Sequence, residues 1–221
     1  MIFNRQHPSR LRVSQRAFRL KQFFFFLSLT LTLSASTASA RTLPVNLAEM
    51  TANAGWVVHG RVAEVRIGRH PEYNNIQVTF ITLDVIEMLK GSASRQFTFM
   101  QFSGGNGTVH NFHLPQYTVG EEVVLFLYPE SRYGFTSPIG EGQGKFLVRD
   151  DPRRGQRALV NEQNNLALFE NLDVAKLQSR LALSKAERGL MAQRSGAVEL
   201  DSFRSLVRKL AVSKRAANKS D

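Results

Sequence analysis

Histidine is the side chain in this sequence best suited to hold a metal, and two of them, His110 and His113, lie three positions apart. Their segment, 108–114, is expected to form a strand, in which side chains three apart point to opposite faces. A zinc site needs at least three converging protein ligands, and neither His59 nor His70 has a metal-binding spacing. We therefore predict no metal site.

A second candidate is the glycine-rich segment Gly140–Lys145 (GEGQGK), which is similar to a phosphate-binding loop. That loop requires Gly, four residues, then Gly-Lys-Ser/Thr, and a following helix whose N-terminus holds the phosphate. Here Ile139 occupies the first position and Phe146 the last, and a strand is expected to follow. We interpret the segment as a turned loop between strands and predict no cofactor.

The sequence offers little support for carboxylate or hydroxyl catalysis. Glu121 and Glu122 are adjacent, so in a strand they would point in opposite directions, whereas paired carboxylate catalysis needs two groups that converge on one bond. Ser103 lacks the G-x-S-x-G pattern of a nucleophile elbow, and the sequence contains no H-E-x-x-H. We predict no catalytic residue, which favours a protein that is not an enzyme.

Aromatic side chains are the remaining candidates, because they can bind sugar or peptide as well as fill a core. With sixteen phenylalanines in the chain, core packing is the default role for an aromatic residue. Among Trp56 and the four tyrosines, we prefer as binding residues those in or beside expected loops. These candidate partner-binding residues are Tyr73, Tyr117 and Tyr133.

The elements that must position these residues begin after an export segment. Six basic residues within the first 21 positions precede an apolar run, 23–33, and small residues that end at Ala40. A basic segment, a short apolar core and an A-x-A site are typical of a secretory signal peptide. We therefore expect residues 1–40 to be removed by cleavage after Ala40, leaving a periplasmic or secreted protein. The apolar core falls short of the roughly twenty residues of a membrane span, so no transmembrane anchor is expected.

Charge and cysteine content narrow the possible functions further. The sequence has no cysteine, which excludes thiol catalysis and Cys-based metal sites. The net charge of +11 is concentrated at the ends, since residues 151–221 carry fourteen Lys and Arg against eight Asp and Glu. Such a tail could contact anionic lipid, cell-wall polymer or nucleic acid, but export argues against nucleic acid. We favour a solvated helix face.

Alternating apolar residues predict a mainly β domain over 41–165, with a basic helical segment over 166–221. Gly60, inside the first predicted strand, indicates a bulge. Residues 122–128 are apolar on both faces and should be covered on both sides. Helices are expected from about Asp173 to a break at 195–196, and after a cap at Asp201 or Ser202. The predicted strands are 56–67, 76–89, 96–102, 108–114, 122–128, 133–138, 145–149 and 157–160.

This pattern predicts a small OB-like barrel, closed or partly open, with one or two C-terminal α-helices, although a β-sandwich fits nearly as well. Four segments together resemble a large group of uncharacterised secreted bacterial proteins: VHGRV at 58–62, LDVIEMLKG at 83–91, GEEVVLFLY at 120–128 and GQGKF at 142–146. The body of that group is similar to the netrin-like or metalloproteinase-inhibitor barrel. The resemblance implies only the barrel, because the inhibitors bind zinc through an N-terminal Cys that this chain lacks.

The expected function is therefore an exported, non-enzymatic interaction module for a protein partner in the cell envelope, with association to a protease as one form of it. Two alternatives remain open. One is an envelope hydrolase whose catalytic residues are dispersed along the chain. The other is a surface-associated protein that its basic tail holds on anionic polymer or lipid.

Overall fold

The computed structural model describes residues 43–103, 114–152 and 155–217, with side chains to Ser213, and these residues belong to one compact unit, Thr42–Asp221. The predicted signal peptide, His110 and His113 lie outside the described residues, as does nearly all of the predicted strand 108–114. None of the described helices is long and apolar enough to span a membrane.

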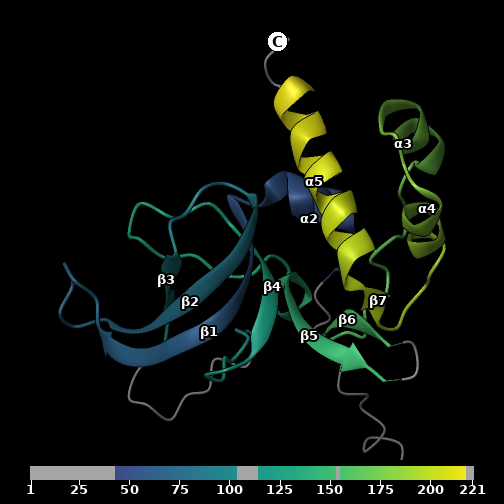
Figure 1. The fold of residues 1–221 in the computed structure, drawn as a ribbon. Helices are drawn as coiled ribbons and strands as arrows, with labels where there is room; N and C mark the ends of the chain where they lie inside the picture. Colours follow the sequence, from purple (N-terminus) through teal and green to yellow (C-terminus); the bar gives the residue numbers. More distant parts are fainter. Residues whose placement is uncertain (1–42, 104–113, 153–154, 218–221) are drawn as a thin grey trace, which may run out of the picture. The chain divides into compact units, whose positions relative to one another are not determined.

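The mainly β prediction is confirmed by one antiparallel, seven-stranded sheet in the described residues (Figure 1). Its strand order is β3-β2-β1-β4-β5-β6-β7. The strands are β1 (Trp56–Arg69), β2 (Gln77–Lys90), β3 (Gln96–Phe102), β4 (Glu122–Leu127), β5 (Lys145–Asp151), β6 (Gln156–Asn161) and β7 (Val198–Glu199). The helices are α2 (Leu47–Asn53), the short 3₁₀ helix η2 (Glu141–Gly144), α3 (Val174–Arg180), α4 (Lys185–Met191) and α5 (Leu200–Ala217).

The sheet is open in its strand order, since it ends at β3 on one side and at β7 on the other. A closed, OB-like barrel is therefore not confirmed. The prediction of a regular strand over 133–138 was wrong, because this segment makes only two isolated bridges. One bridge joins Phe135 to Met100 in β3, and the other joins Pro138 to Leu127 in β4.

The bulge predicted at Gly60 is confirmed. The pairing of β1 with β2 shifts register between His59 and Gly60, and again at two other places along β1. A Cβ atom on Gly60 would lie 2.8 Å from the carbonyl oxygen of Asp84, closer than real Cβ contacts come. Glycine therefore lets the two long strands approach at this point, and the bulge adds to the local twist of the sheet.

Strand β4 is buried along its whole length, as its sequence predicted. Val124 and Phe126 pack into a helix-side core, which also contains Phe146, Phe203, Leu47, Met50, Leu159 and Leu206. Val123, Leu125 and Leu127 point to the opposite face and pack into a sheet-side core with Val58, Val62, Ile81, Leu83, Phe99 and Tyr117. One six-residue strand thus contributes to two apolar cores, one on each face of the sheet.

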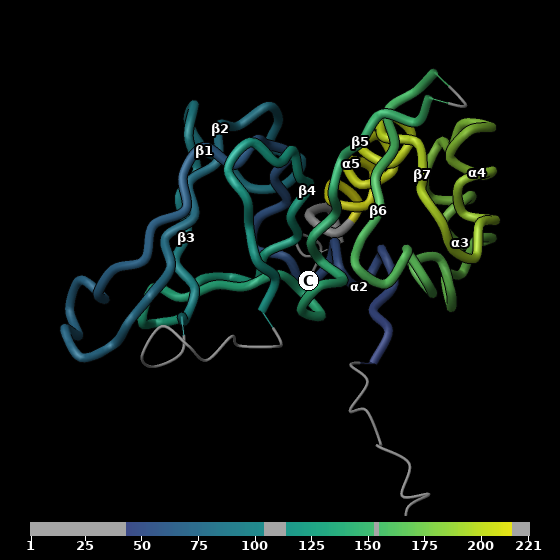
Figure 2. The backbone as a smooth tube through the Cα atoms, turned by 90° about the horizontal axis from the view of Figure 1, so that it is seen from below, coloured from purple at the N-terminus to yellow at the C-terminus, as the bar shows by residue number. Residues whose placement is uncertain are grey.

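The C-terminal helices pack on the sheet. Helix α5 contacts α2, β2, β6 and β7, while α3 and α4 lie toward the β6–β7 end, away from β3 (Figures 1 and 2). Three aromatic rings join α5 to β4 and β5, because the ring centroid of Phe203 lies 6.1 Å from that of Phe126 and 5.2 Å from that of Phe146. The basic segment therefore supplies part of the helix-side core.

Two helix boundaries differ from the prediction. The single helix expected before residue 195 is two helices, because Ser184 and Glu187 form a capping box that starts α4. Helix α5 begins at Leu200, and its cap is neither Asp201 nor Ser202. Instead, the Glu199 carboxylate accepts hydrogen bonds of 2.7 Å from the backbone N–H groups of both residues.

Glu187 also joins α4 to α5 and should make stability depend on pH. Burial by itself would raise the pKa of its carboxyl, but hydrogen bonds from Lys209, the Ser184 backbone and Ser205 outweigh this and lower the pKa from 4.5 to about 2. Since the folded-state pKa lies below the unfolded one, the ionised carboxylate stabilises the fold fully above pH 4.5. That stabilisation is lost as the pH falls toward 2.

We predict that Glu187→Gln lowers the free energy of unfolding by roughly 1–3 kcal/mol at pH 7, and that the difference from the unsubstituted protein shrinks between pH 4.5 and 2. Urea denaturation across this range measures both quantities. Glu170→Gln, at an exposed position, is the control and should change little. A difference that stays constant with pH would contradict the assigned role of Glu187.

Candidate functional site

Two of the three predicted binding tyrosines come together in an aromatic cluster, which consists of His70, Tyr73, Phe102, Tyr133 and Phe135. The Tyr73 and Tyr133 rings meet edge to face, with centroids 5.7 Å apart. His70 packs against Tyr73 at 4.9 Å and against Phe135 at 5.3 Å. The ring of Phe102, at the end of β3, lies 6.4 Å from that of Phe135.

His70 fixes the geometry of this cluster by joining two turns that are far apart in the chain. Its Nδ1 accepts hydrogen bonds of 3.1 Å from the backbone N–H groups of Glu72 and Tyr73, in the β1–β2 turn. Nε2 must therefore carry the proton, and it donates at 2.8 Å to the carbonyl oxygen of Tyr133, in the turn after β4. The two tyrosines are thus held in place, and they stay 39% and 41% exposed as whole residues.

A cavity of about 320 Å³ adjoins the cluster. Its apolar lining includes Phe80, Phe99 and Met100, and its polar lining includes Glu72, Glu130 and Arg132. The Arg132 guanidinium lies 4.6 Å from the centre of the Tyr133 ring and donates a hydrogen bond to its hydroxyl. The aromatic cluster and the adjoining cavity therefore present aromatic rings, apolar side chains and charges of both signs.

Tyr117 does not join the other two tyrosines. It is buried in the sheet-side core, with its ring edge to face against Phe99 and the Lys145 ammonium 4.6 Å from the ring centre. Burial raises the pKa of its phenol, and its hydroxyl has no hydrogen-bond partner among the described residues. A ring in this position packs the core and presents no surface to a partner.

The glycine-rich segment is a turned loop, as expected. Gly140 has a φ of +60°, and η2 leads directly into β5 rather than into a longer helix. The side-chain amide of Gln143 clamps the incoming chain, since it accepts from the backbone of Val45 at 2.9 Å and donates to the carbonyl of Leu43 at 3.0 Å. The contacts of this loop are therefore structural.

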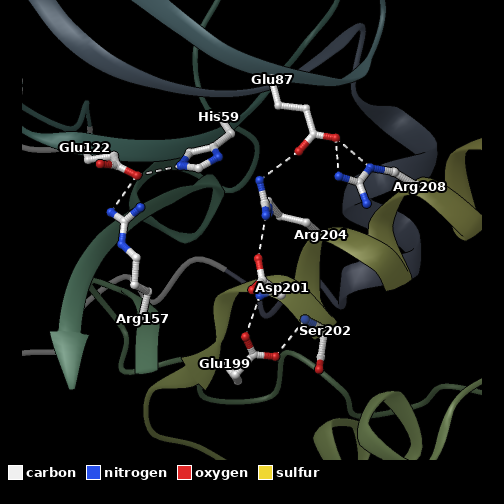
Figure 3. A network of polar contacts seen from close by, with 9 residues as sticks. All are labelled: His59, Glu87, Glu122, Arg157, Glu199, Asp201, Ser202, Arg204 and Arg208. Atoms are coloured by element: carbon white, nitrogen blue, oxygen red, sulfur yellow. Dashed lines mark hydrogen bonds and ion pairs between the residues drawn. The ribbon is translucent and has the colours of Figure 1, made fainter. Parts of the chain in front are cut away.

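A polar network whose centre, His59 and Glu122, is buried lies on the helix-side face of β1 and β4 (Figure 3). In the β1–β4 register, Arg61 is opposite Glu122 and His59 is two residues along on the same face. The Glu122 carboxylate accepts hydrogen bonds from His59 Nε2 at 2.7 Å and from Arg61 at 3.0 Å, and it pairs with Arg157 of β6 at 2.6 Å.

The protonation of this network follows from its contacts. Burial would raise the pKa of Glu122, but hydrogen bonds from His59 and Arg157 outweigh it and lower the pKa, so the carboxylate is ionised. Burial lowers the pKa of His59 and outweighs the hydrogen bond and the charge of Glu122, which act to raise it, so the ring is neutral. An ionised carboxylate can only accept, and the proton of His59 therefore lies on Nε2, leaving Nδ1 with a bare lone pair.

Arginines of α5 extend the network toward β2. Arg204 donates to Glu87 at 2.9 Å and pairs with Asp201, while Arg208 also pairs with Glu87 (Figure 3). Lys209 pairs with Glu187 at 2.7 Å. Three basic side chains of the C-terminal segment are thus engaged in ion pairs, whereas a solvated helix face was expected from the sequence.

Sequence reasoning missed this network. It considered Glu122 only as a partner for Glu121, whereas its partner His59 lies 63 positions away. The two residues come together only because β1 pairs with β4, and no short sequence motif indicates that pairing. Within the residues that the structure describes, His, Asp and Glu side chains form no cluster of three or more able to hold a metal ion.

Comparison of the chain with models of protein families found no match, and comparison with curated proteins found no relative. The resemblance to secreted proteins with a netrin-like barrel therefore stays a prediction from the four segments that carry it.

We predict that His59 has its proton on Nε2 and stays neutral below pH 6.5, its ordinary pKa, because burial opposes its charged form. Long-range ¹H–¹⁵N NMR of the labelled protein reports the tautomer and the titration, and loss of the signal in His59→Gln assigns it. A proton on Nδ1, or a midpoint above pH 6.5, would contradict this assignment.

Proposed function

We propose that this protein is an exported, non-enzymatic interaction module that binds a protein partner through the aromatic cluster. The observation that carries the proposal is the pair of half-exposed rings, Tyr73 and Tyr133, held in contact by the buried His70. Partially exposed aromatic residues held rigidly are typical anchors of protein interfaces, because little side-chain entropy is lost when they bind.

The surroundings of the cluster favour a protein segment as the partner. The adjoining cavity of about 320 Å³ can receive an apolar side chain against Phe80, Phe99 and Met100. Arg132 and the two glutamates beside it, Glu72 and Glu130, supply a polar rim of mixed charge. An apolar centre with a polar rim is the usual anatomy of a protein interface.

We further propose that the β3-β2-β1-β4 half of the sheet belongs to a partly open, OB-like barrel. The two bridges of segment 135–138, one to β3 and one to β4, support this proposal, because they span the gap between these two strands. In the same proposal the protein acts in the periplasm or outside the cell, after removal of residues 1–40. The support for export is the signal-like N-terminal sequence.

A hydrolase is the second candidate, and the pairing of His59 with Glu122 favours it. A neutral imidazole with a free nitrogen, oriented by a buried carboxylate, is the arrangement of a general base. Turnover on a panel of ester, amide and glycoside substrates that is lost in His59→Gln would establish this activity in place of the first proposal.

The tyrosine pair provides the test of the interaction proposal. The exported protein, immobilised, is incubated with envelope extract from the cells that produce it, and the captured proteins are quantified by mass spectrometry. We predict a captured protein that falls at least tenfold with Tyr73→Ala plus Tyr133→Ala, since truncating anchor residues costs about 2 kcal/mol or more each.

Leu166→Ala is the matched control, because Leu166 is a large apolar residue, 58% exposed, that belongs to no part of the aromatic cluster. It should leave capture unchanged. Circular dichroism and urea denaturation of all variants separate loss of binding from loss of folding. If every captured protein is retained by the folded double variant, the cluster is not the interaction surface.

A further inference from the structure

His70 is a titratable side chain whose two ring nitrogens are both engaged while the ring is neutral, and the residue is only 3% exposed. Its Nε2–H donates to the carbonyl oxygen of Tyr133, and the lone pair of Nδ1 accepts from the backbone N–H groups of Glu72 and Tyr73. Among the described residues, those two N–H groups have no other acceptor. The anchoring of Tyr73 therefore depends on an unprotonated Nδ1.

A second proton on the His70 ring is incompatible with this arrangement. It can bind only at Nδ1, because Nε2 already carries a proton. The new N–H would face the N–H groups of Glu72 and Tyr73, and donors cannot bond one another. Both hydrogen bonds must then break, which leaves buried donors without an acceptor until the turn rearranges.

The rearrangement should be local, because only one side of the clamp is lost. Nε2 keeps its proton and its bond to Tyr133. Two backbone hydrogen bonds of 2.9 Å, from His70 to Ile76 and from Ile76 to Tyr73, close the turn without involving the imidazole. The edge-to-face contact of Tyr73 with Tyr133 forms while both turns bind the same ring, so release of one turn should separate the tyrosines and leave the sheet folded.

The neighbours of His70 do not titrate in the same pH range. Imidazole is the side chain that ordinarily changes charge between pH 5 and 8, whereas carboxyl, phenol and guanidinium groups titrate outside it. The cavity residues that β2 and β3 contribute carry no titratable group. The charged or titratable groups around His70 are Arg66 and Arg69 of β1, Glu72 and Tyr73 of its own turn, and Glu130, Arg132 and Tyr133 of the turn after β4.

We propose that His70 is a proton-operated switch of the aromatic cluster. Its neutral ring holds Tyr73 against Tyr133, and its charged ring releases the turn that carries Tyr73. The direction follows from the contacts, since the neutral ring makes three hydrogen bonds and the charged ring can keep only one of them. The consequence for binding, strong near neutral pH and weak in acid, rests on the proposed function.

NMR of the labelled protein tests the switch without any partner. At about pH 8 we expect nuclear Overhauser effects between the rings of Tyr73 and Tyr133. At about pH 5 we expect their loss, together with shifts of the Glu72 and Tyr73 amide resonances. The amides of the buried strand β4 should stay in place, which reports that the fold is intact. A ring contact that persists at about pH 5 would overturn the proposal.

Variants assign the titration to one residue. His70→Gln can hydrogen-bond but does not titrate, so whether it keeps or loses the tyrosine contact, that contact should be the same at both pH values. Glu72→Gln and Glu130→Gln, which remove the two carboxyl groups of the cavity lining, are the matched controls and should switch as the unsubstituted protein does. A contact that still depends on pH in His70→Gln, or a switch abolished by either glutamate variant, would assign the titration to another group.

The capture experiment at the same two pH values separates this proposal from the proposed function. A protein captured through the tyrosine pair at about pH 8 should fall at least about tenfold at about pH 5, and His70→Gln should remove this dependence. Absence of any captured protein would contradict the proposed function alone, because the NMR measurement needs no partner. Equal capture through the tyrosine pair at both pH values would overturn the regulation of binding by His70.

Discussion

The structure depends on the burial of β4 on both faces. Its alternate side chains enter two separate cores, so the strand transmits any loosening of one core to the other. Burying a large apolar side chain contributes about 1.5–3 kcal/mol, and β4 buries Phe126, Leu125 and Leu127 completely. No disulfide is available to this cysteine-free chain, so the sheet and the helices stabilise each other through apolar packing, to which β4 contributes on both faces.

The same strand determines where polar chemistry can occur. Its first residue, Glu122, lies at the edge of the helix-side core, where the pairing with β1 brings His59 and Arg61 to the same face. Arg204 follows the core residue Phe203 in α5, so the packing of that helix also brings a guanidinium to the network. The aromatic cluster depends instead on the length of β1 and β2, whose connecting turn carries Tyr73 to Tyr133.

Several features of the fold could be predicted from sequence because they are local. The run of apolar residues in β4 indicated burial on both faces, and Gly60 indicated the bulge in β1. The contact of His59 with Glu122 could not be predicted, because it depends on the register of two distant strands. The burial of Tyr117 was missed for a related reason, since a residue beside a loop can still point into a core. The capping box of Ser184 was a local signal that could have located α4.

Native-state hydrogen exchange of the folded protein tests the shared role of β4 most directly. If β4 joins the two cores into one cooperative unit, the amides of β4, of β2 near Ile81 and of α5 near Leu206 should exchange with the same free energy, equal to that of global unfolding. Exchange of the α5 amides at a markedly lower free energy, with β4 and β2 still protected, would contradict this account.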